Sequence, residues 1–172
     1  MRMRIAVVLA AVAALGCDKN GTSTQTGVSS SCTVTLSGSI SGSYDCRPAT
    51  TLWSSADNKG DFSFGVTASG TRPAISLAIL WPGQPKDTAY TNADSAAQAA
   101  VSITTSTNQV WQAAVGPGVT ATGSYTLVFS SLVVGSTNAT GIGYSADGTL
   151  NATLTAVTAS GASGVVLVTA TF

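Results

Sequence analysis

CTVTLSGSISGSYDC, residues 32–46, is the stretch of the chain that decides the fold. Apolar residues alternate with hydroxyl residues up to a turn at Gly38 and Ser39, and a second short alternating run leads from the turn to Cys46. Alternation with a period of two is typical of strands that bury one face. The stretch therefore predicts a β-hairpin in which Cys32 faces Cys46 across the strand pair.

The same alternation recurs along the rest of the chain, interrupted by segments rich in Gly, Asn and Pro. The run at 75–81 is apolar on both faces, which predicts a central strand. Short alternating strands with such turns between them predict an all-β fold, an antiparallel β-sandwich that occupies residues 32–172 as a single domain. The strands expected after the first hairpin are 62–68, 75–81, 101–105, 110–115, 125–134, 150–156 and 166–172.

Three segments lack strand periodicity. Residues 47–60 contain a proline and lead into the turn-forming sequence DNKGD, so we expect an irregular segment there. Residues 135–143 are rich in Gly, Asn and Thr and predict a loop. The Ala-rich residues 91–100 predict either a short helix, capped by Asn92 or Asp94, or a loop.

The composition excludes several classes of function. Charged residues make up 8% of the chain, and neither His nor Glu occurs in it. A Ser-His-Asp or Cys-His catalytic arrangement needs a histidine, so the sequence excludes both. No cluster of Lys and Arg suits a nucleic acid, and no glycine-rich segment has the Lys of a phosphate-binding loop. We therefore expect a protein that is not an enzyme, binds no nucleic acid and holds no cofactor.

Asp57 and Asp61 are the two acidic residues closest together in the sequence. One interpretation is a calcium loop, because carboxylates, Asn side chains and backbone carbonyls are the oxygen ligands that Ca²⁺ prefers. Their spacing does not match the EF-hand pattern, and the Asn-Lys-Gly between them is typical of a hairpin turn. We favour the turn and expect no metal site.

The aromatic residues divide into two groups. Trp81 and Trp111 alternate in register with aliphatic neighbours, which predicts that both lie in the core. Trp53 and Tyr90 occur in segments without strand periodicity, so they are the better candidates for exposed rings. Carbohydrate-binding sandwiches stack sugars on exposed rings, and these two residues are therefore the candidate site for a carbohydrate or another ligand.

The chain begins with MRMRIAVVLAAVAALGC, residues 1–17. Two arginines precede an apolar run at 5–15 that is shorter than the about 20 residues of a transmembrane helix and fits an export signal. With ALGC at its end, the stretch resembles the lipobox of bacterial lipoproteins, although an alanine stands where the family most often has Leu. The resemblance implies that a diacylglyceryl group is attached to the Cys17 thiol, that the chain is cut after Gly16 and that the new amino terminus is acylated. The alternative is an ordinary secretory signal in which Cys17 has no role.

With Cys17 assigned to lipid, Cys32 and Cys46 are the remaining cysteines. An exported protein meets oxidising conditions, so these two are expected to form a disulfide. The resulting organisation is a signal helix at 1–16, a lipid-anchored flexible linker at 17–31 and the folded domain after it. Such a protein would be held on the inner or the outer membrane of a bacterial cell envelope, facing the periplasm or the cell surface.

These observations favour a membrane-anchored envelope lipoprotein of structural or interaction type, with an envelope protein or a glycan as its partner. The first alternative is a carbohydrate-binding or ligand-binding lipoprotein that uses Trp53. The second alternative is a small outer-membrane β-barrel, because the alternating residues 166–172 end in an aromatic residue, as the last strand of such barrels usually does. An aromatic content of 6% is low for the two aromatic girdles of a membrane barrel.

Overall fold

The computed structural model describes residues 31–46, 50–86, 88–92, 98–116 and 122–172. The predicted signal peptide, Cys17 and nearly all of the predicted linker lie outside the described residues. Within these ranges the chain forms eleven strands, all paired antiparallel, which confirms the predicted all-β fold. The elements are Cys32–Gly38 (β1), Gly42–Cys46 (β2), Thr50–Ser54 (β3), Lys59–Val66 (β4), Ala74–Pro82 (β5), Ala89–Thr91 (β6), Gln98–Thr104 (β7), Val110–Val115 (β8), Ser124–Asn138 (β9), Gly141–Ala156 (β10) and Val165–Thr171 (β11), with a 3₁₀ turn at Thr158–Ser160 (η1).

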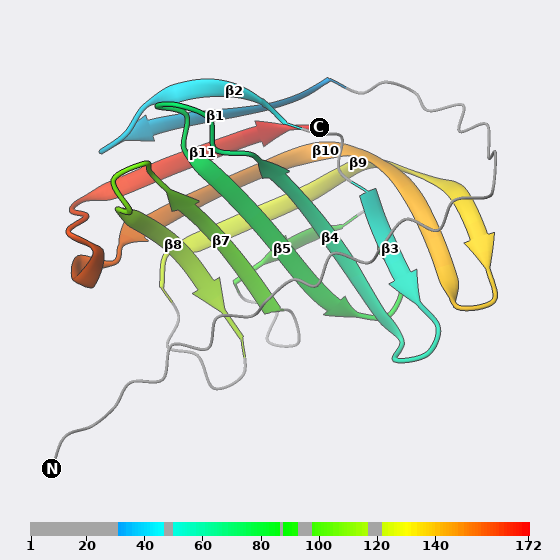
Figure 1. Ribbon diagram of the computed structural model, residues 1–172. Helices are drawn as coiled ribbons and strands as arrows, with labels where there is room; N and C mark the ends of the chain where they lie inside the picture. Colours follow the sequence, from blue (N-terminus) through cyan, green and yellow to red (C-terminus); the bar gives the residue numbers. More distant parts are fainter. Residues whose placement is uncertain (1–30, 47–49, 87, 93–97, 117–121) are drawn as a thin grey trace, which may run out of the picture.

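The strands form two layers that cross obliquely, with the core between them (Figure 1). One layer holds β2, β1, β11, β10 and β9, and the other holds β3, β4, β5, β7 and β8. The long strand β10 joins the layers, because it pairs with β9 and β11 of the first and with β3 and β8 of the second. Register shifts after Gly143 and Asp147 interrupt the β9–β10 ladder, and such bulges allow a strand to bend from one sheet into another.

The first hairpin, β1–β2, forms as predicted, and β10 and β11 form a second hairpin at the end of the chain. In β1–β2, Cys32 lies directly opposite Cys46, and in β10–β11, Leu150 lies opposite Ala170. β11 also pairs with β1, so the first and last hairpins of the chain make one continuous four-stranded sheet. Strand β5 lies between β4 and β7, which confirms that the run at 75–81 is central.

Three segments differ from the sequence-based expectation. Residues 50–54, expected to be irregular, form β3 because they pair with both β4 and β10. The expected loop at 135–143 consists mostly of the ends of β9 and β10, which meet in a tight turn at 139–140. The prediction of a helix over 91–100 is wrong at both ends, because Thr91 is the last residue of β6 and Gln98 is the first residue of β7. Residues 93–97 lie outside the described part of the chain.

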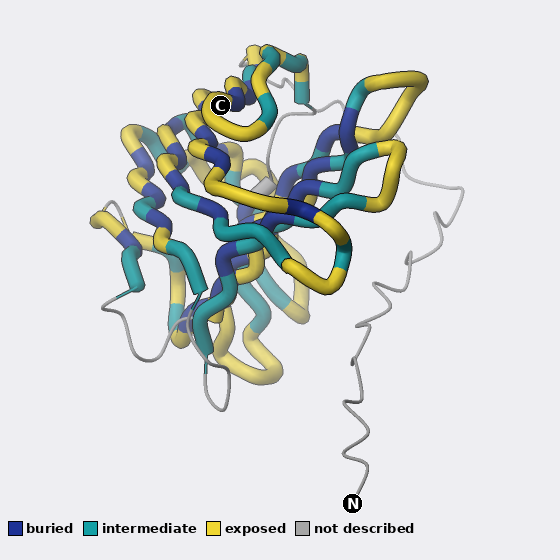
Figure 2. The backbone as a smooth tube through the Cα atoms, turned by 90° about the vertical axis from the view of Figure 1, so that its left-hand side faces the viewer, coloured by how far each residue is buried: buried dark blue, intermediate teal, exposed yellow. Residues whose placement is uncertain are grey.

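Aromatic rings from both layers meet in the core. Phe62 of β4 is fully buried, and its ring centroid lies 5.4 Å from that of Phe129 of β9 and 4.7 Å from that of Phe172. Trp81 and Trp111 are both 3% exposed, which confirms that they are core residues. Buried and exposed residues alternate along the strands in Figure 2, as expected for two sheets that each turn one face inward. Edge-to-face contacts between rings add to the stabilisation that their burial provides.

Candidate functional site

The predicted exposed pair of Trp53 and Tyr90 does not form. Tyr90 is only 8% exposed, and its ring packs on that of Trp81 with centroids 4.6 Å apart. Its hydroxyl oxygen accepts a hydrogen bond from the backbone N–H of Lys86 at 2.9 Å. The prediction of an exposed Tyr90 is wrong because β6 pairs with β9, and this long-range pairing carries the ring into the core.

Trp53 has a different environment at the end of β3. Its side chain is half-buried, and its Nε1–H donates a hydrogen bond to Oδ1 of Asn58 at 3.2 Å. In the strand register Trp53 lies opposite Gly60 of β4, and Gly60 lies opposite Trp81 of β5. The glycine therefore separates two tryptophans that belong to the same face of the sheet.

Asp57 and Asp61 flank a turn, as predicted. The β3 and β4 strands are joined by residues 55–58, with Asn58 in the left-handed region at φ 50°, and the backbone N–H of Gly83 donates to the Asn58 carbonyl at 2.7 Å. The hydrogen bond from Ser54 lowers the pKa of Asp57, which is fully exposed. Burial raises the pKa of Asp61, although its Oδ1 accepts a hydrogen bond from the backbone N–H of Leu52 at 3.3 Å.

In the described residues no three His, Cys, Asp or Glu side chains gather in a group that could hold a metal ion. Nor does the described part of the chain contain a helix with the length and hydropathy needed to cross a membrane.

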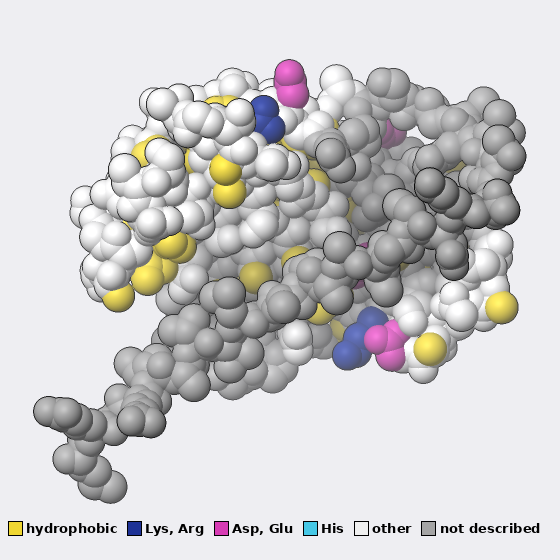
Figure 3. Space-filling model, viewed as in Figure 1, with side chains coloured by type: hydrophobic (Ala, Val, Ile, Leu, Met, Phe, Trp, Pro, Cys, Tyr) yellow, Lys and Arg dark blue, Asp and Glu magenta, His cyan; other side chains and the backbone are white. Residues whose placement is uncertain are grey.

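A pocket of about 230 Å³ opens beside this turn, at the ends of β4, β5 and β7. In Figure 3, acidic and basic side chains gather over the β3–β4 turn at the lower edge of the molecule. Sequence reasoning did not find this pocket, because its lining comes from three strands and a turn that only the sheet register brings together. The lining residues are Asp57, Asn58, Lys59, Leu80, Trp81, Pro82 and Gln98.

The glycine between the two tryptophans fixes the wall of the pocket. A Cβ atom at Gly60 would lie less than 3.0 Å from Nε1 of Trp81 and from the carbonyl oxygen of Gly83. The Trp81 indole therefore occupies the space that a side chain at position 60 would fill. Its Nε1 is buried and has no hydrogen-bond partner in the part of the chain that the structure describes. Buried donors in this state are uncommon in native proteins and call for an explanation.

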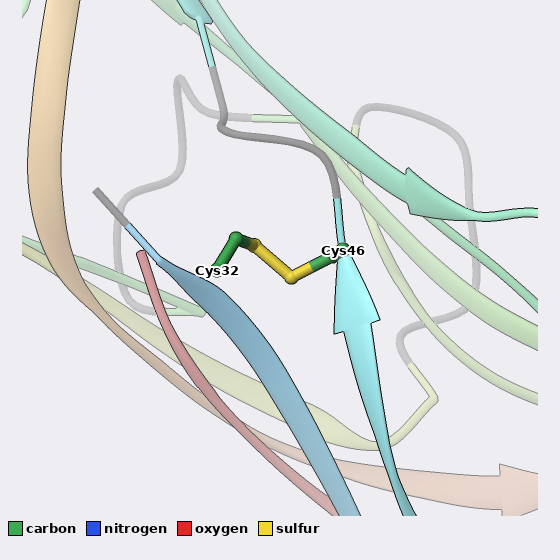
Figure 4. Close-up of a disulfide and its surroundings, with 2 residues drawn as sticks. All are labelled: Cys32 and Cys46. Atoms are coloured by element: carbon green, nitrogen blue, oxygen red, sulfur yellow. A yellow bond between two sulfur atoms is a disulfide. The ribbon is translucent and has the colours of Figure 1, made fainter. Parts of the chain in front are cut away.

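The predicted disulfide between Cys32 and Cys46 is present and fastens the open end of the first hairpin (Figure 4). The two Cα atoms are 5.0 Å apart, and Cys32 is 4% exposed at the margin of the core. Among the described strands β2 pairs with β1 alone, so the bond holds an edge strand against the sheet.

The outer face of the four-stranded sheet carries rows of hydroxyl side chains. Thr33 of β1, Thr171 of β11 and Thr149 of β10 lie side by side in register, and the next row is formed in the same way by Thr35, Thr169 and Asn151.

Comparisons of the whole chain with protein-family models, curated proteins and solved structures give no match. We therefore infer the chemistry of the pocket and of this face from their own residues and not from relatives.

Proposed function

We propose that the chain is a lipid-anchored protein of a bacterial cell envelope whose β-sandwich acts by binding and not by catalysis. The observation that carries this proposal is the amino-terminal sequence, in which a short basic segment, an apolar run and Leu15-Gly16-Cys17 follow one another. Several acyl chains on Cys17 would hold the protein on a membrane durably, where one chain would not.

The arrangement of the chain after Cys17 supports an anchored domain. The first strand begins at Cys32, and residues 18–31 before it are mostly Ser, Thr, Gly and other polar types. A spacer of this length reaches at most about 50 Å when fully extended, which is enough to let the domain stand clear of a bilayer surface. The Cys32–Cys46 disulfide supports export, because disulfides persist in oxidising compartments outside the cytoplasm.

A binding role is favoured over catalysis by the chemistry that the side chains offer. The chain has no His and no Glu, which leaves Asp, Lys and Tyr as the main side chains for general acid–base work. What the domain does present is a small pocket beside the β3–β4 turn and a face of mostly hydroxyl side chains on the opposite layer. Both are surfaces for recognition.

Metabolic labelling with an alkyne fatty acid tests the anchor. The wild-type protein should incorporate the label and stay with the membrane fraction after a high-salt wash, and Cys17→Ser should lose the label. Cys32→Ser is the matched control, because it also replaces a cysteine with serine but leaves the lipid site intact, and it should remain labelled. A wild-type protein without label, or a Cys17→Ser variant that keeps it, would contradict the proposal.

A further inference from the structure

We propose that the pocket beside the β3–β4 turn binds a neutral sugar ring, either a monosaccharide or the end of a glycan. This inference rests on the binding role proposed above and names the class of ligand. The pocket, at about 230 Å³, is smaller than the about 300–1,000 Å³ of sites that hold drug-sized ligands. It suits one small ring and not an extended peptide.

One side of the pocket is apolar. Leu80 points outward from β5 and is 38% exposed, and Pro82 follows it on the same face of the strand. Trp81, which is buried and lies between Leu80 and Pro82 in the sequence, also contributes to the lining. A sugar ring has a face of C–H groups that packs on such a surface, whereas a small inorganic ion gains nothing from it.

The polar lining matches hydroxyl groups in its hydrogen-bonding capacity. Asp57 only accepts hydrogen bonds, Lys59 only donates them, and the Gln98 amide does both. A sugar hydroxyl both donates and accepts, so neighbouring hydroxyls on one ring can use all three groups. The charges of Asp57 and Lys59 are opposite, and the lowered pKa of Asp57 favours its ionised form. The pair has no net charge, which favours a neutral ligand over an anion or a cation.

The wall of the pocket is held in place before any ligand arrives. Trp81 packs on Tyr90 behind it, and Gly60 leaves the space into which the indole fits. The indole of Trp81 points to the core side of β5, where its N–H is buried without a partner in the described part of the chain.

Titration of the mature protein in detergent micelles tests the proposal, with the three tryptophan indole N–H signals in ¹H–¹⁵N spectra as the readout. The ligands to be used are D-glucose, D-galactose and N-acetyl-D-glucosamine. At least one of them should shift the Trp81 signal with a millimolar dissociation constant, as expected for a ligand of this size. The Trp111 signal is the internal control, because its N–H donates to the Ser163 carbonyl at 3.1 Å and lies outside the pocket.

Matched variants assign the shift to the pocket. Lys59→Ala should weaken binding by about three- to tenfold through the loss of a hydrogen bond. Leu80→Ser should weaken it as well by removing the apolar surface. Lys86→Ala and Leu167→Ser are the controls, since both residues are exposed and neither lines the pocket, and they should bind as the wild type does.

Two results would overturn the proposal: no movement of the Trp81 signal with any of the three sugars well above millimolar concentration, or a shift that both pocket variants leave unchanged. Neither result depends on lipid at Cys17, which the labelling experiment tests separately, so failure of the sugar site and failure of the anchor are distinguishable.

Discussion

Replacing Gly60 with alanine adds a single methyl group at the most restricted point of the β3–β4–β5 sheet. Gly60 is buried, and the added Cβ would come within 3.0 Å of the Trp81 indole and of the Gly83 carbonyl. The indole cannot simply swing away, because its ring packs on that of Tyr90. Either the tryptophan or the β5 backbone has to move.

The expected change in the free energy of unfolding combines a packing cost and a backbone gain, and Gly65 on the same strand is the matched control. Overpacking a core position costs about 1–3 kcal/mol, and replacing a strand glycine with alanine recovers about 0.5–1 kcal/mol. The balance is a loss of about 0–2.5 kcal/mol. Because the added Cβ would have contacts below 3.0 Å, we expect Gly60→Ala to lie in the upper part of this range, at about 1–2.5 kcal/mol. At Gly65 the added Cβ would be 3.2 Å from the Ile75 carbonyl oxygen, with no other heavy atom within 4 Å. Gly65→Ala should therefore change stability by less than about 0.5 kcal/mol.

Urea denaturation followed by tryptophan fluorescence measures both variants against the wild type. The Trp81 indole N–H signal should also shift in Gly60→Ala and stay in place in Gly65→Ala. Equal stability of the two variants, or an unmoved Trp81 signal in Gly60→Ala, would refute the packing that we assign to this wall of the pocket.

Three further predictions concern the rest of the domain. Replacing Cys32 and Cys46 together with alanine should lower the free energy of unfolding by about 3 kcal/mol, because the bond closes a loop with a sequence separation of 14; an unchanged urea midpoint would contradict this. Burial raises the pKa of Asp61 above its ordinary value of 3.8, so the folded state binds a proton at this carboxyl more tightly than the unfolded state does. Protonation of Asp61 therefore stabilises the fold at low pH, and this contribution is lost as the pH rises through the folded-state pKa. Asp61→Asn should therefore unfold at a higher temperature than the wild type at pH 7, and the difference should disappear below about pH 4; a difference independent of pH would exclude this cause. Phe62→Ala should cost about 3–5 kcal/mol in thermal or urea unfolding, since a fully buried ring that contacts three others is removed, and a loss below 1 kcal/mol would mean that the core is arranged differently.

Local alternation in the sequence predicts the fold where one face of a strand is buried and the other is polar. The runs that became β1, β4, β10 and β11 have this pattern, and the first hairpin forms with the expected register of Cys32 opposite Cys46. Strand β3 escaped prediction because its pattern is reversed. Thr51 points into the core and is fully buried, whereas its neighbour Leu52 is 51% exposed. Pairing on both sides, and not side-chain polarity, makes this segment a strand.

The candidate site was harder to predict, because it depends on contacts between distant parts of the sequence. Tyr90 lies in a three-residue strand whose burial is decided by β9, more than thirty positions later. The pocket combines Lys59, Leu80 and Gln98, which become neighbours only through the β4–β5 and β5–β7 registers. Two local signals were present in the sequence: the turn-forming residues 57–61, and Leu80, which made the run at 75–81 apolar on both faces.

The intact mass of the protein purified from native membranes tests the central claim, that lipid on Cys17 anchors a binding domain. We predict a chain that begins at Cys17 and is heavier than its polypeptide by a diacylglyceryl group and an amide-linked acyl chain. An unmodified chain with a free Cys17 thiol, released into the culture medium, would contradict the account.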